Sequence, residues 1–274
     1  MANIILDVKN LNKSFIVERS LSRKIKNLFS KEAPEIVHAL NNVSFCVKEG
    51  ETLGILGESG SGKSTLARAL MGIHGVDSGS ATLLGREVIG ASGQERLSIL
   101  RDMQMIFQDP FGSLDPRMTV RQILSEPLKI HSINPEGGIE SFLENAITEV
   151  GLDKEALDRY PTEFSGGQRQ RIGICRALVL NPKLIIADEA VSALDVSVQA
   201  QILELLMDLK KKRGLSMIFI SHDVAVVRQI SDRIILLYHG DIVEELDADK
   251  LLTDAKHEYS KKLLGAALSL REVV

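Results

Sequence analysis

The sequence of 274 residues lacks the features that mark disulfide-linked, metal-clustered and membrane-spanning proteins. It has only two cysteines, Cys46 and Cys175, which lie far apart within apolar segments and form no CxxC spacing. We therefore expect buried, reduced thiols and neither a disulfide nor a metal site. The longest apolar runs, such as 184–187 and 234–238, are far shorter than the roughly 18 residues that a membrane helix needs. Any membrane contact is expected to be peripheral.

The sequence also has little excess charge, and no targeting segment is expected. The formal net charge is −4 and the pI is about 5.9, which gives no overall electrostatic reason to bind nucleic acid. The first residues include no basic segment followed by a long apolar stretch, so no secretion signal is expected and the protein is predicted to stay in the cytoplasm. Hydrophobic residues make up 44% and charged residues 26%, as in a folded globular protein.

Strand and helix patterns alternate along the chain, as in an α/β domain. We expect strands at 4–8, 43–47, 52–56, 104–107, 184–187, 217–220, 234–237 and 241–243, and helices at 64–71, 199–213 and 259–268. The region from about 112 to 180 looks mainly helical and is punctuated by prolines, which predicts an inserted helical subdomain. No internal repeat or low-complexity stretch is visible.

An insertion at 18–37 separates the first two expected strands. We favour a solvated loop there, and a surface for lipid headgroups is the alternative. The insertion is basic through Arg19, Arg23, Lys24, Lys26 and Lys31.

A glycine-rich turn between the strand at 52–56 and the helix at 64–71 has the spacing GxxxxGK[ST] of a phosphate-binding P-loop. Glycines let the backbone turn so that several N–H groups face phosphate oxygens, and the positive end of the helix adds to that field. Lys63 would hold the β- and γ-phosphates, the Ser64 hydroxyl suits a magnesium ligand, and Thr65 is a supporting contact at most. A glycine-rich turn without a ligand is the alternative, which the matching context weakens. The motif comprises Gly57, Glu58, Ser59, Gly60, Ser61, Gly62, Lys63 and Ser64.

Two carboxylates follow the apolar strand at 184–187. Because adjacent strand residues point to opposite sides, Asp188 and Glu189 can serve different partners. We assign Asp188 to the magnesium shell and Glu189 to polarising the attacking water. Taken alone, such a pair is more often part of a solvated turn. Only its place after a P-loop favours a catalytic role.

Phe164, Ser165, Gly166, Gly167 and Gln168 resemble the LSGGQ signature of the ATP-binding-cassette (ABC) ATPases, with Phe in the first position. A P-loop, this signature and then a strand ending in Asp-Glu look specific to that family in this order, and the resemblance covers essentially the whole chain. The alternative is a simple helix N-cap with serine at the cap. Both can hold, because an N-cap with two exposed glycines leaves N–H groups free for a phosphate.

The resemblance implies a head-to-tail pair of ATPase subunits, either identical or related, with two ATP molecules and Mg²⁺ held between the P-loop of one and the signature of the other. It implies that Gln108 senses magnesium and the attacking water, that His222 contacts the γ-phosphate, and that Asp195 lies in a loop crossing the dimer interface. Phe15 corresponds to the aromatic that stacks on adenine, and core packing is an equal alternative.

The same resemblance implies an α/β P-loop NTPase of ABC ATPase type, with a mostly parallel sheet core, an antiparallel β subdomain and an inserted helical subdomain. We predict one domain over 1–274. Within it, 1–108 and 181–240 form the nucleotide-binding core, 109–180 the helical subdomain, and 241–274 a C-terminal strand and helix.

Residues 107–117 and 192–201, and the insertion before Val37, look like the subfamily that imports peptides or nickel. His257, Tyr259, Leu263 and Leu264 resemble its C-terminal HPYxxxLL pattern, although Glu258 replaces the proline. This resemblance implies a peripheral protein on the cytoplasmic face of the cell membrane, with two integral permease subunits and, indirectly, an extracytoplasmic solute-binding protein.

The cargo is addressed only by weak cues, because ATPase subunits do not touch it. Ala190 after Glu189, and the lack of a longer cysteine-bearing C-terminal region, favour the nickel or metallophore branch over the peptide branch.

Two other classes of protein fit the sequence less well. A soluble ABC ATPase acting on ribosomes generally carries two cassettes in one chain, and one acting on DNA inserts a long coiled coil between P-loop and signature. A P-loop kinase or GTPase would not explain residues 165–168.

Overall fold

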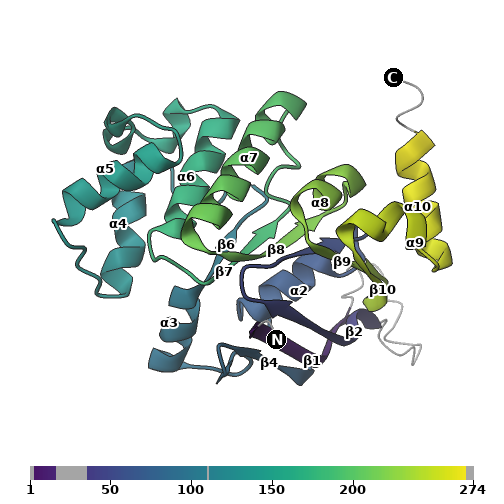
Figure 1. The fold of residues 1–274 in the computed structure, drawn as a ribbon. Coiled ribbons are helices and arrows are strands. Elements are labelled where there is room, and N and C mark those ends of the chain that lie inside the picture. Colours follow the sequence, from purple (N-terminus) through teal and green to yellow (C-terminus); the bar gives the residue numbers. More distant parts are fainter. Residues whose placement is uncertain (1–2, 17–35, 110, 270–274) are drawn as a thin grey trace, which may run out of the picture.

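The computed structural model describes residues 3–16, 36–109 and 111–269, and Figure 1 shows their arrangement. Two sheets and the helices that cover them make up this part of the chain. Within these residues, no helix combines the length and apolar character needed to cross a bilayer. The basic insertion that we interpret as a solvated loop lies almost entirely outside the described residues.

The larger sheet has six strands in the order β10-β9-β3-β8-β7-β6. All neighbouring pairs are parallel except β10 with β9. Every residue of β3, β7 and β8 is buried, which explains their nearly continuous apolar sequences, because both faces of a parallel sheet are covered. The strands are β3 (Thr52–Leu56), β6 (Met103–Ile106), β7 (Leu184–Asp188), β8 (Ser216–Ser221), β9 (Arg233–Tyr238) and β10 (Asp241–Asp247).

The smaller sheet is antiparallel, in the order β2-β1-β4-β5. It consists of β1 (Ile4–Ile16), β2 (Ile36–Lys48), β4 (Ser78–Leu83) and β5 (Arg86–Glu87). The expected strands at 4–8 and 43–47 were correctly placed but too short, because polar residues such as Ser14 and His38 hide the apolar alternation while still pairing across the strands. The predicted combination of a mostly parallel sheet with an antiparallel one is confirmed.

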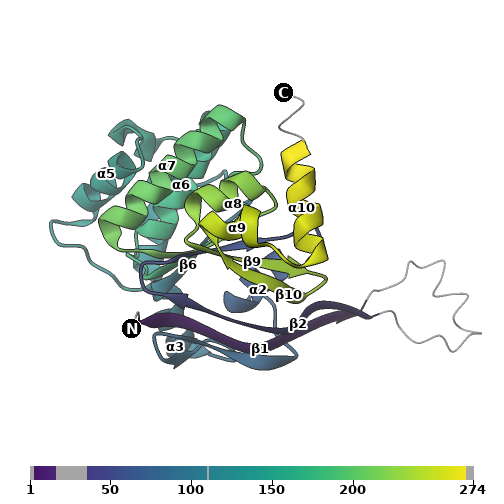
Figure 2. The ribbon, with the colours of Figure 1, turned by 45° about the vertical axis from the view of Figure 1, so that its right-hand side comes forward.

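Helices fill the space between the sheets and cover the outer face of the larger one. Figure 2 shows α2 between the two sheets and α6, α7 and α8 on the other side of the six-stranded sheet. The helices are α2 (Lys63–Leu70), α3 (Gly93–Asp102), α4 (Val120–Ile130), α5 (Ile139–Glu149), α6 (Gly166–Leu178), α7 (Val196–Arg213), α8 (Val224–Ile230), α9 (Leu251–Asp254) and α10 (Glu258–Ser269). Short 3-10 turns lie at Lys154–Asp158, Pro161–Glu163 and Ala248–Lys250.

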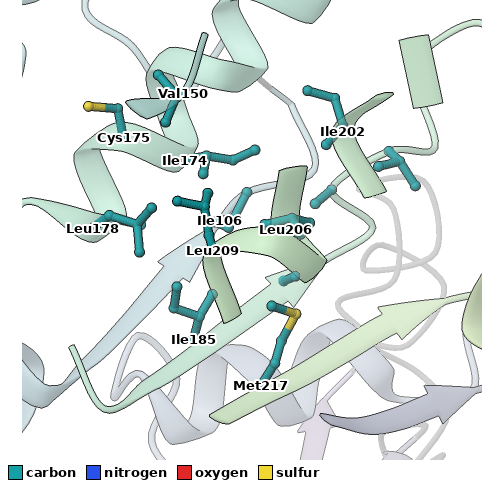
Figure 3. Packing of buried hydrophobic residues seen from close by; sticks show 14 of the residues in the cluster. Ile106, Val150, Ile174, Cys175, Leu178, Ile185, Ile202, Leu206, Leu209 and Met217 are labelled. Carbon is teal, nitrogen blue, oxygen red and sulfur yellow. The ribbon is translucent and has the colours of Figure 1, made fainter. Parts of the chain in front are cut away.

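Two apolar clusters fix these layers. One joins α2 to both sheets, and the other packs α6 and α7 against the larger sheet. Figure 3 shows the second, in which Ile174 and Leu178 of α6 and Leu206 of α7 lie near Ile106 and Ile185 of the strands. The phosphate-binding turn and the signature segment therefore belong to helices on opposite faces of one sheet.

The two thiols differ from each other. Cys175 is buried, and burial raises the pKa of its thiol to about 12, so it stays protonated. Cys46 is only half-buried, so the expectation of two buried thiols was wrong for Cys46. Its position near the end of β2 explains the difference, because alternate residues of this strand face away from the core. Both are free thiols in the structure.

Candidate functional site

The turn at 57–62 connects β3 to α2 and requires glycine at defined positions. Gly60 and Gly62 have positive φ values of 82° and 110°. A Cβ atom on Gly57 would lie under 3.0 Å from the Leu237 carbonyl oxygen, and one on Gly62 equally close to the carbonyl oxygen of Ala39. Gly62 is the N-cap of α2 and has no side chain to cap it, so no capping side chain occupies the first N–H groups of the helix, which are natural donors for an anion.

Lys63 is folded back over this turn. Its Nζ donates hydrogen bonds of 2.7 Å to the Gly57 carbonyl and 2.8 Å to the Glu58 carbonyl. Burial lowers the pKa of the ammonium group, and the nearby carboxylates of Glu189, Asp188 and Glu58 oppose that shift. The lysine thus makes internal contacts that phosphate oxygens could replace.

Ser64 and Asp188 meet at the carboxyl end of β7. The Ser64 Oγ donates a 3.0 Å hydrogen bond to Asp188 Oδ1, and Asp188 is only 3% exposed. Burial raises the pKa of this carboxyl group, and the neighbouring charge of Glu189 adds to the shift. A hydroxyl oxygen paired with a buried carboxylate is a donor set that suits Mg²⁺.

Asp188→Asn is expected to stabilise the nucleotide-free protein at neutral pH while removing its response to magnesium. A carboxyl group whose pKa is raised by folding contributes stability at low pH, and this contribution is lost as the pH rises through the folded pKa. Asparagine is never charged, so thermal unfolding from pH 5 to 8 should show a midpoint a few degrees higher, with less dependence on pH.

Magnesium provides the control for this variant. Any rise in midpoint that Mg²⁺ adds to the effect of a bound phosphate compound should disappear in Asp188→Asn, because an amide supplies no anionic ligand. An unchanged magnesium response would remove Asp188 from the metal shell.

Glu189 is the centre of a second group of side chains. Gln108 Nε2 donates a 2.9 Å hydrogen bond to Glu189 Oε2, and His222 Nδ1 lies 3.5 Å from Glu189 Oε1. Glu189 has a φ of 46°, a conformation that non-glycine residues rarely adopt and that often marks functional sites. The ends of β6, β7 and β8 thus bring together three side chains that are far apart in sequence.

The signature segment forms the start of α6. Ser165 is its N-cap, with Gln168 completing a capping box in which each side chain bonds the backbone N–H of the other residue. A Cβ on Gly166 would meet only Leu194 Cδ2, at 3.7 Å. The expectation of two exposed glycines was wrong, because both are half-buried and a Cβ on Gly167 would lie under 3.0 Å from Val198 of α7.

Asp195 and Phe15 lie in separate places. Asp195 caps α7 by accepting a 3.0 Å hydrogen bond from the Val198 N–H, beside the signature segment. Phe15 is near the end of β1, is 37% exposed, and meets the ring of His74 edge-on with centroids 5.6 Å apart. This exposure argues against core packing, and Lys13 Nζ lies over the ring, 5.0 Å from its centroid.

The structure therefore brings most of the expected residues into one site and leaves another set outside it. The turn between β3 and α2 and the start of α2 (57–65) lie beside four side chains from the strand ends: Gln108, Asp188, Glu189 and His222. The signature residues and Asp195 form a second cluster on α6 and α7. Tyr259, whose hydroxyl accepts a hydrogen bond from the Glu58 N–H of the P-loop, was not among the predicted site residues. Its place in the HPYxxxLL resemblance was the sequence signal available for it.

Comparisons with known proteins agree with this arrangement. The family model for the ABC transporter matches residues 40–192. The chain is 45% identical over 264 residues to the oligopeptide transport ATP-binding protein OppF of Haemophilus influenzae, covering 96% of this chain and 78% of that protein. It is 44% identical to the glutathione import ATP-binding protein GsiA of Pectobacterium atrosepticum, covering 97% of this chain and 41% of that longer protein.

A solved structure gives the same result. The dimeric post-hydrolysis state of the ATP-binding cassette MJ0796, bound to ADP and Pi, matches with a TM-score of 0.74 and 28% identity, over 89% of this chain and 98% of that one. The family model matches more than half of the chain, and both relatives are more than 40% identical to it over almost all of its length. The chain therefore belongs to the ABC transporter family and is one of its ATP-hydrolysing subunits.

Proposed function

We propose that this subunit powers a peptide importer by binding ATP between two ATPase subunits. One observation supports the proposal: a single chain holds a P-loop site and, on a helix of the opposite face of the same sheet, a signature segment whose N-terminus would meet a phosphate on another molecule. Each chain thus offers two half-sites. A head-to-tail pair, of identical or related subunits, would complete both.

Each residue of the P-loop site has a proposed role. Residues 57–65 hold the phosphates through backbone N–H groups, with Lys63 leaving its two carbonyl partners for the β- and γ-phosphates. Glu189 polarises the attacking water, because its carboxylate lies within reach of both Gln108 and His222. Gln108 orients this carboxylate, and His222 contacts the γ-phosphate. Phe15 stacks on the adenine ring.

Ser64, Asp188 and Gln108 would hold Mg²⁺ together with the nucleotide. The fit rests on the oxygen donors of Ser64 and Asp188, which already lie 3.0 Å apart, and on the buried charge of Asp188 that a cation would neutralise. When bound, the ion would neutralise charge on the β- and γ-phosphates.

The second cluster would act across the pair. Ser165, Gly166, Gly167 and Gln168 present the start of α6 to the triphosphate of the other subunit, and Asp195 lies beside them at the interface. We retain the division into a nucleotide-binding core (1–108 and 181–240), a helical subdomain (109–180) and a C-terminal strand and helix (241–274) as part of this proposal.

The face that meets the membrane subunits is proposed to lie next to Gln108. Phe107 and Phe111 are exposed there, and Arg176 and Arg169 of α6 lie over their rings at 5.7 Å and 3.5 Å. These contacts join the residues on either side of Gln108 to the signature helix. Movement of α6 on closure would therefore reach the surface that two permease subunits cover at the cytoplasmic face of the membrane.

Peptide is the proposed cargo class because the relatives are named for oligopeptide and glutathione import. The nickel branch that the sequence cues favoured receives less support from these names. An extracytoplasmic binding protein would select the cargo.

Purification of the tagged subunit from its own membranes tests this proposal. Two integral membrane subunits and a second ATPase chain should co-purify, and in proteoliposomes a peptide-loaded binding protein should stimulate ATP hydrolysis. Stimulation by a nickel chelate alone would overturn the peptide assignment. Recovery with ribosomes and without any membrane subunit would overturn the importer itself.

A further inference from the structure

The C-terminal helix touches the P-loop through one side chain. Tyr259, the second residue of α10, is 7% exposed, and its Oη accepts a 2.8 Å hydrogen bond from the N–H of Glu58, 201 residues earlier in the chain. In Figures 1 and 2, α10 stands beside β9 and β10, at the edge of the larger sheet. The contact thus reaches the nucleotide site from outside the segment that carries its motifs.

Tyr259 is held firmly on its own side of this contact. Its ring stacks on Tyr238 at the end of β9, with centroids 4.1 Å apart and planes inclined by 29°. The Tyr259 N–H donates to His257 Nδ1 at 3.2 Å, and the N–H of Lys256 donates to the Glu244 carboxylate of β10 at 2.6 Å. The start of α10 is therefore fixed to the edge strand β10 and to its neighbour β9, and the hydroxyl has a defined position.

The two leucines of the same sequence pattern fasten the helix to the core. Leu264 is buried in the larger apolar cluster, and Leu263 packs against it. The pattern at 257–264 thus combines an attachment to the core with a contact to the phosphate loop.

On the loop side, both backbone groups of Glu58, the N–H and the carbonyl, are hydrogen-bonded. Its N–H bonds to Tyr259, and its carbonyl accepts from Lys63 Nζ at 2.8 Å and from the Ser61 N–H at 3.2 Å. Lys63 is the one partner that must leave when its ammonium group turns to a nucleotide. Tyr259 then remains as the side chain that holds the backbone of Glu58, through its N–H.

We propose that Tyr259 is a positioning residue for ATP binding: its hydroxyl keeps the first half of the P-loop in its phosphate-binding shape after Lys63 has turned to the nucleotide. The proposal rests on the proposed assignment of residues 57–64 as the phosphate site. It gives α10 a part in the nucleotide cycle, because any displacement of this helix would release the Glu58 N–H. ATP binding and the position of α10 should therefore influence each other.

Tyr259→Phe tests the hydroxyl alone in the full-length subunit, because the ring and its stacking are kept. Loss of one hydrogen bond to the loop should raise the Kd for Mg-ATP about three- to tenfold, with kcat at saturating ATP changed less than about twofold. Exchange of the Glu58 amide hydrogen, followed by NMR with Mg-ATP bound, should become faster. Tyr238→Phe is the matched control and should leave the Kd and the amide exchange unchanged.

Lys63→Ala, measured in parallel, separates the two levels of the proposal. If Lys63→Ala loses ATP binding while Tyr259→Phe keeps the wild-type Kd and amide exchange, the inference about Tyr259 is wrong and the phosphate site stands. A lower thermal midpoint in Tyr259→Phe at unchanged Kd would also overturn it, since the contact would then be only structural. Wild-type ATP binding by Lys63→Ala would overturn the phosphate site itself.

Discussion

Replacement of Glu189 by glutamine is expected to lower ATP hydrolysis about a hundred- to ten-thousand-fold while ATP binding is retained. The amide keeps the size of the side chain and its oxygen, so the hydrogen bond from Gln108 can persist. It loses the negative charge that polarises water, and a positioned general base contributes a rate factor of about this size. Single-turnover hydrolysis and equilibrium binding of labelled ATP measure the two effects separately.

Glu204→Gln is the matched control for this prediction. Glu204 is an exposed carboxylate on α7, so the same chemical change there should leave hydrolysis within about twofold. Near-normal turnover in Glu189→Gln would remove Glu189 from its proposed role. A parallel loss of binding would show that Glu189, whose φ is positive directly after β7, mainly supports the fold around the P-loop.

The second large effect is expected at Gly166, where aspartate should block closure of the ATPase pair without unfolding the subunit. The space around Gly166 admits a side chain, since a Cβ would touch only Leu194 at an ordinary distance of 3.7 Å. The new carboxylate would face the triphosphate held by the other subunit. At about 4 Å, two like charges near a protein surface repel by about 4 kcal/mol, a factor of about a thousand in the closure equilibrium.

Light scattering in the presence of ATP and the Glu189→Gln change should detect the dimer, and thermal unfolding should detect the fold. Gly166→Asp is expected to stay monomeric with a wild-type midpoint. Gly167→Ala provides the contrast, because its methyl group would clash with Val198 of the same chain and destabilise the monomer by about 1–3 kcal/mol. If Gly166→Asp dimerised at the same ATP concentration as the protein that keeps Gly166, this result would contradict the proposed interface.

Most of the P-loop site could be predicted from the sequence because its parts follow strand ends. Apolar strands at 52–56, 184–187 and 217–220 are each followed by residues of distinctive chemistry, and parallel strands bring their carboxyl ends to one edge. The starts of helices could be predicted only within a few residues. Asp195, for example, starts α7 at Val196, three residues before the apolar periodicity becomes clear.

Contacts between distant segments could not be predicted. Nothing in the local pattern places Tyr259 against Glu58 or Val198 against Gly167, because both contacts depend on how the packed layers align. The prediction that the two signature glycines are exposed was wrong for this reason. A motif gives the type of each residue, whereas tertiary packing decides which of its faces remains open.

A structure of the assembled ATPase pair carrying Glu189→Gln, with Mg-ATP bound, would show whether each nucleotide is held from both sides. We predict that Ser165 and the N–H groups at the start of α6 of one subunit contact the γ-phosphate bound by the P-loop of the other. A pair in which Ser165, Gly166 and Gly167 point away from every triphosphate would contradict the claim.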